Sequence, residues 1–140
     1  MKDINYYGTF IQVAPDSPVE ASVIPTSNRK KTPAHLIAYQ LLSEHPYTFT
    51  QEEILFEIHV RHKAIPQAEL DAHRDLLWKK FFSKNMACLR ASALPKKFGW
   101  GVHFDEAGRI KLVAMESAEY TQFSNSDCKQ LMALRSKRAR

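Results

Sequence analysis

Apolar residues recur along this chain in patterns that predict short strands and amphipathic helices. Aromatic and β-branched residues predict a first strand over 6–13, and the proline- and serine-rich stretch 14–31 predicts a loop. Thr32-Pro33 predicts an N-cap followed by a proline at the first helical position, and this helix is expected to end before Pro46. Its apolar positions recur at helical spacing: Ala34, Ile37, Ala38, Leu41 and Leu42.

The next segment, 50–62, carries two conflicting signals. Thr50-Gln51-Glu52-Glu53 matches a capping box that would open a helix, whereas Phe56, Ile58 and Val60 alternate with polar residues as in a half-buried strand. We therefore expect one helical turn followed by a strand over about 55–62. After Pro66, the apolar face of Leu70, Leu77 and Phe81, widened by Trp78 and Phe82, predicts a helix to about Ser83.

The second half of the chain predicts a β-hairpin. Residues 99–105 and 109–115 flank Asp105-Glu106-Ala107-Gly108, a sequence typical of a type I turn closed by a left-handed glycine. A three-residue loop would pair Phe104 with Ile110, Val102 with Leu112 and Trp100 with Ala114 on one apolar face. His103 and Lys111 would then pair on the opposite face.

Shorter elements complete the expected fold. We expect a short strand over 88–92, a turn or helix over 117–123 and a last short helix from about Asp127. The sum is a single α+β domain, with an antiparallel sheet of four to five strands and three to four helices. Its body spans 1–127, and 128–140 form a basic C-terminal helix end or tail.

Charge is distributed unevenly, which changes the meaning of the net +5 over 140 residues. The tail carries five cations and no acid, so residues 1–127 are neutral, with 15 charges of each sign. Within this body, 76–104 carry six cations and no acid: Lys79, Lys80, Lys84, Arg90, Lys96 and Lys97. A solvated helix end explains the tail without any ligand, and the helix dipole explains part of the 79–84 stretch.

Several classes of protein are excluded or disfavoured. The longest apolar runs have four residues, too few to span a bilayer, and the N-terminus has no apolar signal-peptide core, so we expect a cytoplasmic protein. Cys88 and Cys128 make neither a disulfide framework nor a Cys-x-x-Cys motif. His59 and His62 could bind a metal together only on a helix, because positions three apart on a strand point to opposite faces. The sequence contains no glycine-rich phosphate-binding loop. We expect no metal site and no cofactor.

Three stretches have a familiar order and spacing: Asn5-Tyr6-Tyr7-Gly8-Thr9-Phe10-Ile11, Cys88-Leu89-Arg90-Ala91-Ser92 and Gly99-Trp100-Gly101-Val102-His103. They resemble a family of small bacterial proteins known only as a domain of unknown function. The resemblance covers nearly the whole body and excludes the basic tail. It implies one domain and a cytosolic location, and it transfers no activity, cofactor or catalytic residue.

Strand alternation predicts one polar sheet face. If the strands are neighbours, this face would carry Arg90, His103, Lys111, His59 and Glu57, with Cys88 near its rim and a gap at Gly101. Cations and histidines in this arrangement would suit a carboxylate or a phosphate. The simpler alternative is a solvated face of mixed charge.

We therefore expect binding of an anionic small molecule or a protein partner, and we favour binding over catalysis. A first alternative is nonspecific nucleic-acid binding through the tail and the 79–97 stretch, with Phe98 or Trp100 for stacking. A second alternative is a cysteine-dependent enzyme, with Cys88 as the thiolate nucleophile, His103 as the base and Glu57 as the orienting carboxylate.

Overall fold

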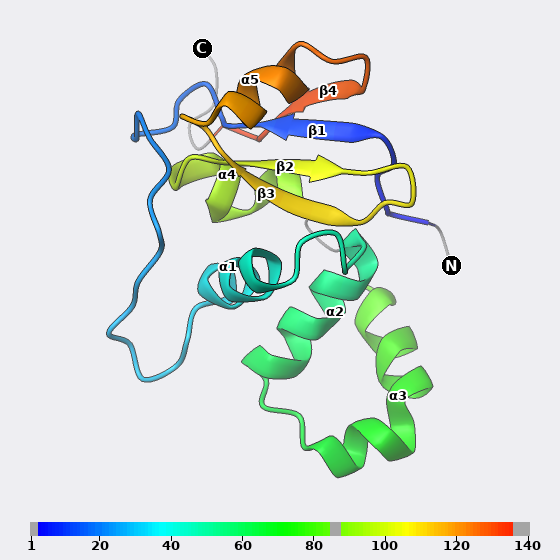
Figure 1. Cartoon of the computed structure of the whole chain (residues 1–140). Helices are drawn as coiled ribbons and strands as arrows, with labels where there is room; N and C mark the ends of the chain where they lie inside the picture. The colour runs from blue at the N-terminus through cyan, green and yellow to red at the C-terminus, as the bar shows by residue number, and fades with distance from the viewer. Residues whose placement is uncertain (1–2, 85–87, 136–140) are drawn as a thin grey trace.

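The computed structural model of the chain describes residues 3–84 and 88–135, which form one mixed sheet with helices on both of its faces (Figure 1). The strands are β1 (Thr9–Gln12), β2 (Trp100–Phe104), β3 (Ile110–Ala114) and β4 (Lys129–Met132), in the order β3-β2-β1-β4. The described residues also contain five α-helices and one 3₁₀ turn: α1 (Ala34–Glu44), α2 (Gln51–His62), α3 (Gln67–Phe82), η1 (Leu89–Ala91), α4 (Ala93–Lys97) and α5 (Ala118–Ser124). The α+β class is confirmed, whereas the expected helix count was too low.

The β2–β3 hairpin has the predicted register. Phe104 pairs with Ile110, Val102 with Leu112 and Trp100 with Ala114, while His103 lies opposite Lys111. The turn is held by the Asp105 carboxylate, which accepts hydrogen bonds from the amides of Ala107 and Arg109. This element was predictable because its register follows from local alternation and turn chemistry.

The end of the chain differs from the prediction. Residues 129–132 form β4 rather than a helix, and β4 runs parallel to β1, so the sheet is mixed and not antiparallel. The Lys129 amide donates to the carbonyl of Gly8, and the Ala133 amide donates to that of Gln12. A four-residue segment is too short to hold a helix by itself, whereas the free edge of β1 supplies backbone partners for a strand.

One face of the sheet builds the main core. Ile11, Val102 and Phe104 point toward α1 and α2, and the buried helical partners in this cluster are Ile37, Ala38, Leu41, Leu42 and Ile54. On the other face, Phe10 packs against the rings of Tyr120 and Phe123 from α5. The sheet therefore has α5 on one side and α1 and α2 on the other (Figure 1).

The strand predicted over 55–62 is wrong, because α2 is helical from Gln51 to His62. The capping box at Thr50 and Glu53 is formed. The misleading alternation arises because α2 is buried on two sides: Ile58 packs on the main core, while Phe56 and Val60 pack against α3. Two apolar stripes on one helix imitate the period of a strand.

The strand predicted over 88–92 is also wrong. Leu89–Ala91 form the 3₁₀ turn η1, and Ser92 then caps α4, its hydroxyl accepting from the Leu94 amide. The Leu89 amide donates to the Gln51 side chain at 2.9 Å, and the Arg90 carbonyl accepts a hydrogen bond from the Leu134 amide. It is β4, rather than this segment, that pairs with the edge of β1.

The remaining helices follow the sequence patterns. α1 and α3 have nearly the predicted bounds, with a break from helical geometry in α3 at His73, and α5 lies where a turn or helix was expected. None of the described helices combines the length and the apolar character needed to cross a membrane.

Candidate functional site

His103 and Lys111 share a sheet face, as predicted, but α5 covers it. The His103 ring stacks on Phe123 with ring centroids 3.9 Å apart, and its Nδ1 lies 2.8 Å from the Tyr47 hydroxyl. The Lys111 ammonium donates to the Glu119 carboxylate at 2.8 Å. These side chains bind one another and hold α5 to the sheet.

Burial sets the protonation state of this cluster. It lowers the pKa of His103 below its usual value and outweighs Asp105 and Glu119, which act in the opposite direction. Burial also raises the pKa of Tyr47, and the carboxylates of Glu119 and Asp105 add to that effect. A neutral imidazole next to a protonated phenol is a stable hydrogen-bonded pair at neutral pH.

Gly101 does not open a gap on this face. A Cβ there would lie 2.8 Å from ring carbons of both Phe10 and Tyr120. The space that the sequence suggested for a ligand is filled by these two rings. Glycine is present because α5 packs closely on the strand.

Arg90 and Cys88 lie on the other side of the sheet. Cys88 is the N-cap of η1 and Arg90 lies within it. The Arg90 Nε donates to the Met132 carbonyl of β4 at 2.9 Å. The Tyr6 hydroxyl donates to the Cys88 sulfur at 3.5 Å, and the Tyr6 ring packs on Phe104, which points toward the main core. Cys88 and His103 are therefore separated by the sheet and do not form a nucleophile–base pair.

His59 and Glu57 lie on α2 and point in different directions. The His59 ring packs on Phe81 of α3, with ring centroids 4.5 Å apart. Glu57 forms a salt bridge with Arg61 at 3.3 Å. The five residues predicted to share a binding face thus occupy three regions, because two of the predicted strands are helical.

The segment around His59 and His62 is helical, which was the condition for a metal pair. The two rings nevertheless line different cavities, His59 between α2 and α3 and His62 next to Lys30 and Lys31. Across 3–84 and 88–135 no three metal-ligating side chains of the His, Cys, Asp and Glu types are gathered.

The residues nominated for stacking on nucleic-acid bases are engaged within the protein. Phe98 stacks on His35, and Trp100 packs against Tyr39 while its Nε1 donates to the Val23 carbonyl. In the basic tail, Lys129 belongs to β4 and Arg135 is exposed, while Lys137, Arg138 and Arg140 lie outside the described residues.

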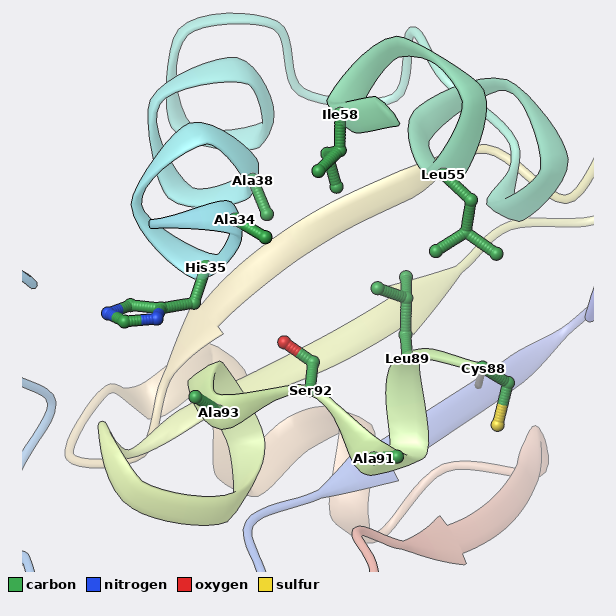
Figure 2. A pocket seen from close by; sticks show the side chains of 10 residues that line it. All are labelled: Ala34, His35, Ala38, Leu55, Ile58, Cys88, Leu89, Ala91, Ser92 and Ala93. Atoms are coloured by element: carbon green, nitrogen blue, oxygen red, sulfur yellow. The ribbon is translucent and has the colours of Figure 1, made fainter. Parts of the chain in front are cut away.

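An apolar pocket of about 300 Å³ lies between α1, α2 and the η1–α4 segment (Figure 2). Its walls are mostly small or aliphatic, and its polar residues are His35, Cys88 and Ser92. Figure 2 shows His35 and Cys88 at opposite ends, with the imidazole and the thiol directed away from the cavity. The His35 ring stacks on Phe98, the Cys88 sulfur accepts from the Tyr6 hydroxyl, and the Ser92 hydroxyl accepts from the Leu94 amide. The pocket offers apolar contact and no assembled catalytic group.

A larger cavity of about 590 Å³ lies between the segment before α1 and the end of α2. We call it the basic cavity, and its lining consists of Lys30, Lys31, Thr32, Ile37, Gln40, Arg61, His62, Lys63 and Ala64. Four lysine or arginine side chains and one histidine meet there, and none of the lining residues is acidic. The volume is typical of a small-ligand site.

The turn after α2 positions one wall of the basic cavity. The Ile65 amide donates to the Val60 carbonyl and the Ala64 amide to that of Arg61, with Ala64 in the left-handed region at a φ of 51°. This arrangement ends the helix abruptly and leaves Arg61 and Lys63 exposed at the rim.

Sequence reasoning missed this cavity, although its residues form two visible clusters. Arg29-Lys30-Lys31 and Arg61-His62-Lys63 are basic triplets about thirty residues apart. Only the packing of α1 against α2 brings them together. The signal in the sequence was a repeated basic triplet. One triplet precedes the helix predicted to begin at Pro33, and the other follows the capping box at Thr50.

The fold and the cavities define a small α+β protein with a mixed sheet and a cationic cavity in its helical layer. The chain belongs to a family of unknown function, DUF6157, which it matches over residues 1–139. The match includes the basic tail, which the resemblance found in the sequence had left out. No curated protein and no solved structure matches the chain.

Proposed function

We propose that this protein binds a small multivalent anion, carrying carboxylate or phosphate groups, in the basic cavity. The observation that carries the proposal is the convergence of Lys30, Lys31, Arg61, His62 and Lys63 around about 590 Å³ of open space. Arginine and lysine are the side chains that bind such groups most strongly.

Helix dipoles account for only some of these cations. Arg61, His62 and Lys63 lie at the C-terminal end of α2, where positive charge is favourable. Lys30 and Lys31 instead precede α1, at the end of that helix where positive charge is unfavourable. The first turn of α1 has no acidic residue, and its N-cap Pro33 supplies no side-chain hydrogen bond. An anion in the cavity would offset this unfavourable charge.

Isothermal titration calorimetry with citrate and with pyrophosphate, at constant ionic strength, tests the proposal. The Lys31→Gln/Lys63→Gln double variant should lower the association constant at least about tenfold, because the loss of even one charge-assisted hydrogen bond is worth about 1.5 kcal/mol or more. Lys97→Gln, an exposed lysine at the end of α4, is the matched control and should leave binding unchanged.

Two results would overturn the proposal. One is the absence of heat with either anion at low salt for the wild type. The other is binding to a single-stranded oligonucleotide that weakens steeply between about 50 and 200 mM salt and that citrate does not compete with, which would favour the nucleic-acid alternative.

A further inference from the structure

A second cavity lies between α2 and α3, and its chemistry differs from that of the basic cavity. Its volume is about 390 Å³, and we call it the interhelical cavity. It is lined by His59, Lys63, Ile65, Leu77, Lys80, Phe81 and Lys84, of which only Lys63 also lines the basic cavity. Its size suits a small organic molecule rather than a single ion.

The walls of the interhelical cavity are apolar. Ile65, Leu77 and Phe81 belong to the cluster that joins α2 to α3, and all three are only partly buried. The His59 ring lies against Phe81 at an interplanar angle of 30°. Burial, together with Lys63, His62 and Lys84, lowers the pKa of His59, so its imidazole is neutral at pH 7 and extends the apolar wall.

The rim of the interhelical cavity is positively charged. Lys63, Lys80 and Lys84 line it, no lining residue is acidic, and none of these lysines forms a salt bridge within the described parts of the chain. The acidic side chains of α2 face elsewhere: Glu52 accepts a hydrogen bond from the Ile4 amide, and Glu53 and Glu57 line a smaller cavity of about 230 Å³ on the α2–α3 pair, together with Arg74.

An apolar cavity with a cationic rim matches one class of ligand. Helix dipoles explain why lysines lie near the ends of α2 and α3, but they do not explain partly exposed Leu77 and Phe81 between those lysines. A molecule with an apolar body and one anionic head would cover the apolar walls and neutralise the rim at the same time.

From this combination we propose that the interhelical cavity binds a small amphipathic carboxylate, such as a medium-chain fatty acid or an aryl-alkyl carboxylic acid. The apolar body lies against Leu77 and Phe81, and the carboxylate accepts hydrogen bonds from the ammonium groups of the rim. The proposal shares only Lys63 with the function proposed for the basic cavity, and the two can be tested separately through Lys80 and Lys84 on one side and Lys31 on the other.

Calorimetric titration of the full chain with hexanoate, heptanoate, octanoate and octanol tests this proposal. The association constant should rise about fourfold for each methylene added between hexanoate and octanoate. Lys80→Gln/Lys84→Gln should weaken octanoate binding at least about tenfold and leave octanol binding unchanged. Lys79→Gln, an exposed neighbour on α3 outside the cavity lining, should bind octanoate as the wild type does.

A second variant tests the cavity itself. Leu77→Trp fills the space and should abolish octanoate binding while the circular dichroism spectrum stays that of the wild type. If this variant does not fold, the lysine pair decides the outcome, because Lys80 and Lys84 are exposed and outside the core. Octanoate binding that is absent in the wild type, or unchanged in the lysine pair, would refute the proposal.

Two further measurements separate this site from other sources of the same signal. Lys31→Gln should weaken citrate binding and leave octanoate binding intact, so the two proposals can fail separately. If citrate instead displaces octanoate and Lys31→Gln removes both, the two ligands share the basic cavity and the interhelical site is wrong. Sedimentation with vesicles of anionic phospholipid, without binding of free octanoate, would indicate a membrane surface and would also contradict the proposal.

Discussion

At Gly101 the sheet and α5 approach so closely that no side chain fits between them. Ring carbons of Phe10 and Tyr120 lie 2.8 Å from the position that a Cβ would occupy. Phe10 is fully buried, and the Tyr120 hydroxyl accepts a hydrogen bond from the Val13 amide at 2.9 Å. Neither ring can turn aside without breaking other contacts.

Gly101→Ala should therefore destabilise the protein. The clash costs about 1–3 kcal/mol, as overpacked cores do. Replacing a glycine within a strand by alanine stabilises the folded state by about 0.5–1 kcal/mol, because the unfolded chain loses conformational freedom. The free energy of unfolding should fall by roughly 1 kcal/mol, the difference between the middle values of these two ranges. Urea denaturation followed by fluorescence measures it. Greater stability in the alanine variant would mean that α5 is not packed as closely as described.

Among the elements, α2 connects the two halves of the hydrophobic interior. Its N-terminal turn is fixed to the edge of β3. The Ile110 amide donates to the Phe49 carbonyl at 2.9 Å, and the backbones of Thr50 and Arg109 form an isolated antiparallel β-bridge. Both the basic cavity and the interhelical cavity are lined by its C-terminal end. The start of α2 thus sets the position of both candidate sites.

Thr50→Ala should remove the cap of this helix. The Thr50 hydroxyl accepts from the Glu53 amide at 3.3 Å, and the Thr50 amide donates to the Glu53 carboxylate at 2.9 Å. Loss of the hydroxyl should lower the free energy of unfolding by about 1 kcal/mol, whereas Thr50→Ser should retain most of it. Equal urea midpoints for the alanine and serine variants would show that the hydroxyl contributes nothing to stability.

Across the whole molecule, burial lowers the pKa of three histidines, His35, His59 and His103. Nearby cations add to this effect at His35 and His59, while at His103 burial outweighs the neighbouring carboxylates. The three rings lie in different regions, so their effects on stability add. All three favour a folded state with neutral imidazoles.

Stability should therefore decrease on mild acidification. In the unfolded chain these histidines take up protons near pH 6.5, whereas in the folded chain they do so only at lower pH. In the pH range between the folded and the unfolded pKa, the unfolded state therefore binds more protons, and acidification favours it. The urea midpoint should fall as the pH is lowered from about 7.5 through 6.5 to about 5. His103→Gln should flatten this dependence, and the exposed His73→Gln is the control. A midpoint that rises on acidification would contradict the assigned direction of the pKa shifts.

Local patterns were enough to predict the hairpin and the helices α1 and α3, whereas they left the α5 segment open between a turn and a helix. The pairing of Val102 with Leu112 follows from period-two alternation and a glycine turn, and Pro33 and Pro46 bracket α1. The predicted binding face failed because it required 55–62 and 88–92 to be strands. Its five residues had no spatial relation that the sequence could establish.

The amino-acid sequence by itself determined the α+β class, the hairpin register and the unequal distribution of charge, because each depends on neighbours within a few residues. Tertiary structure alone decided that 129–132 pair with β1, that α2 is buried on two sides and that α5 closes the face around His103. It also decided that two basic triplets meet in one cavity. The physical reason is that short segments have nearly balanced local preferences, so contacts between residues far apart in the chain select one conformation and one set of neighbours.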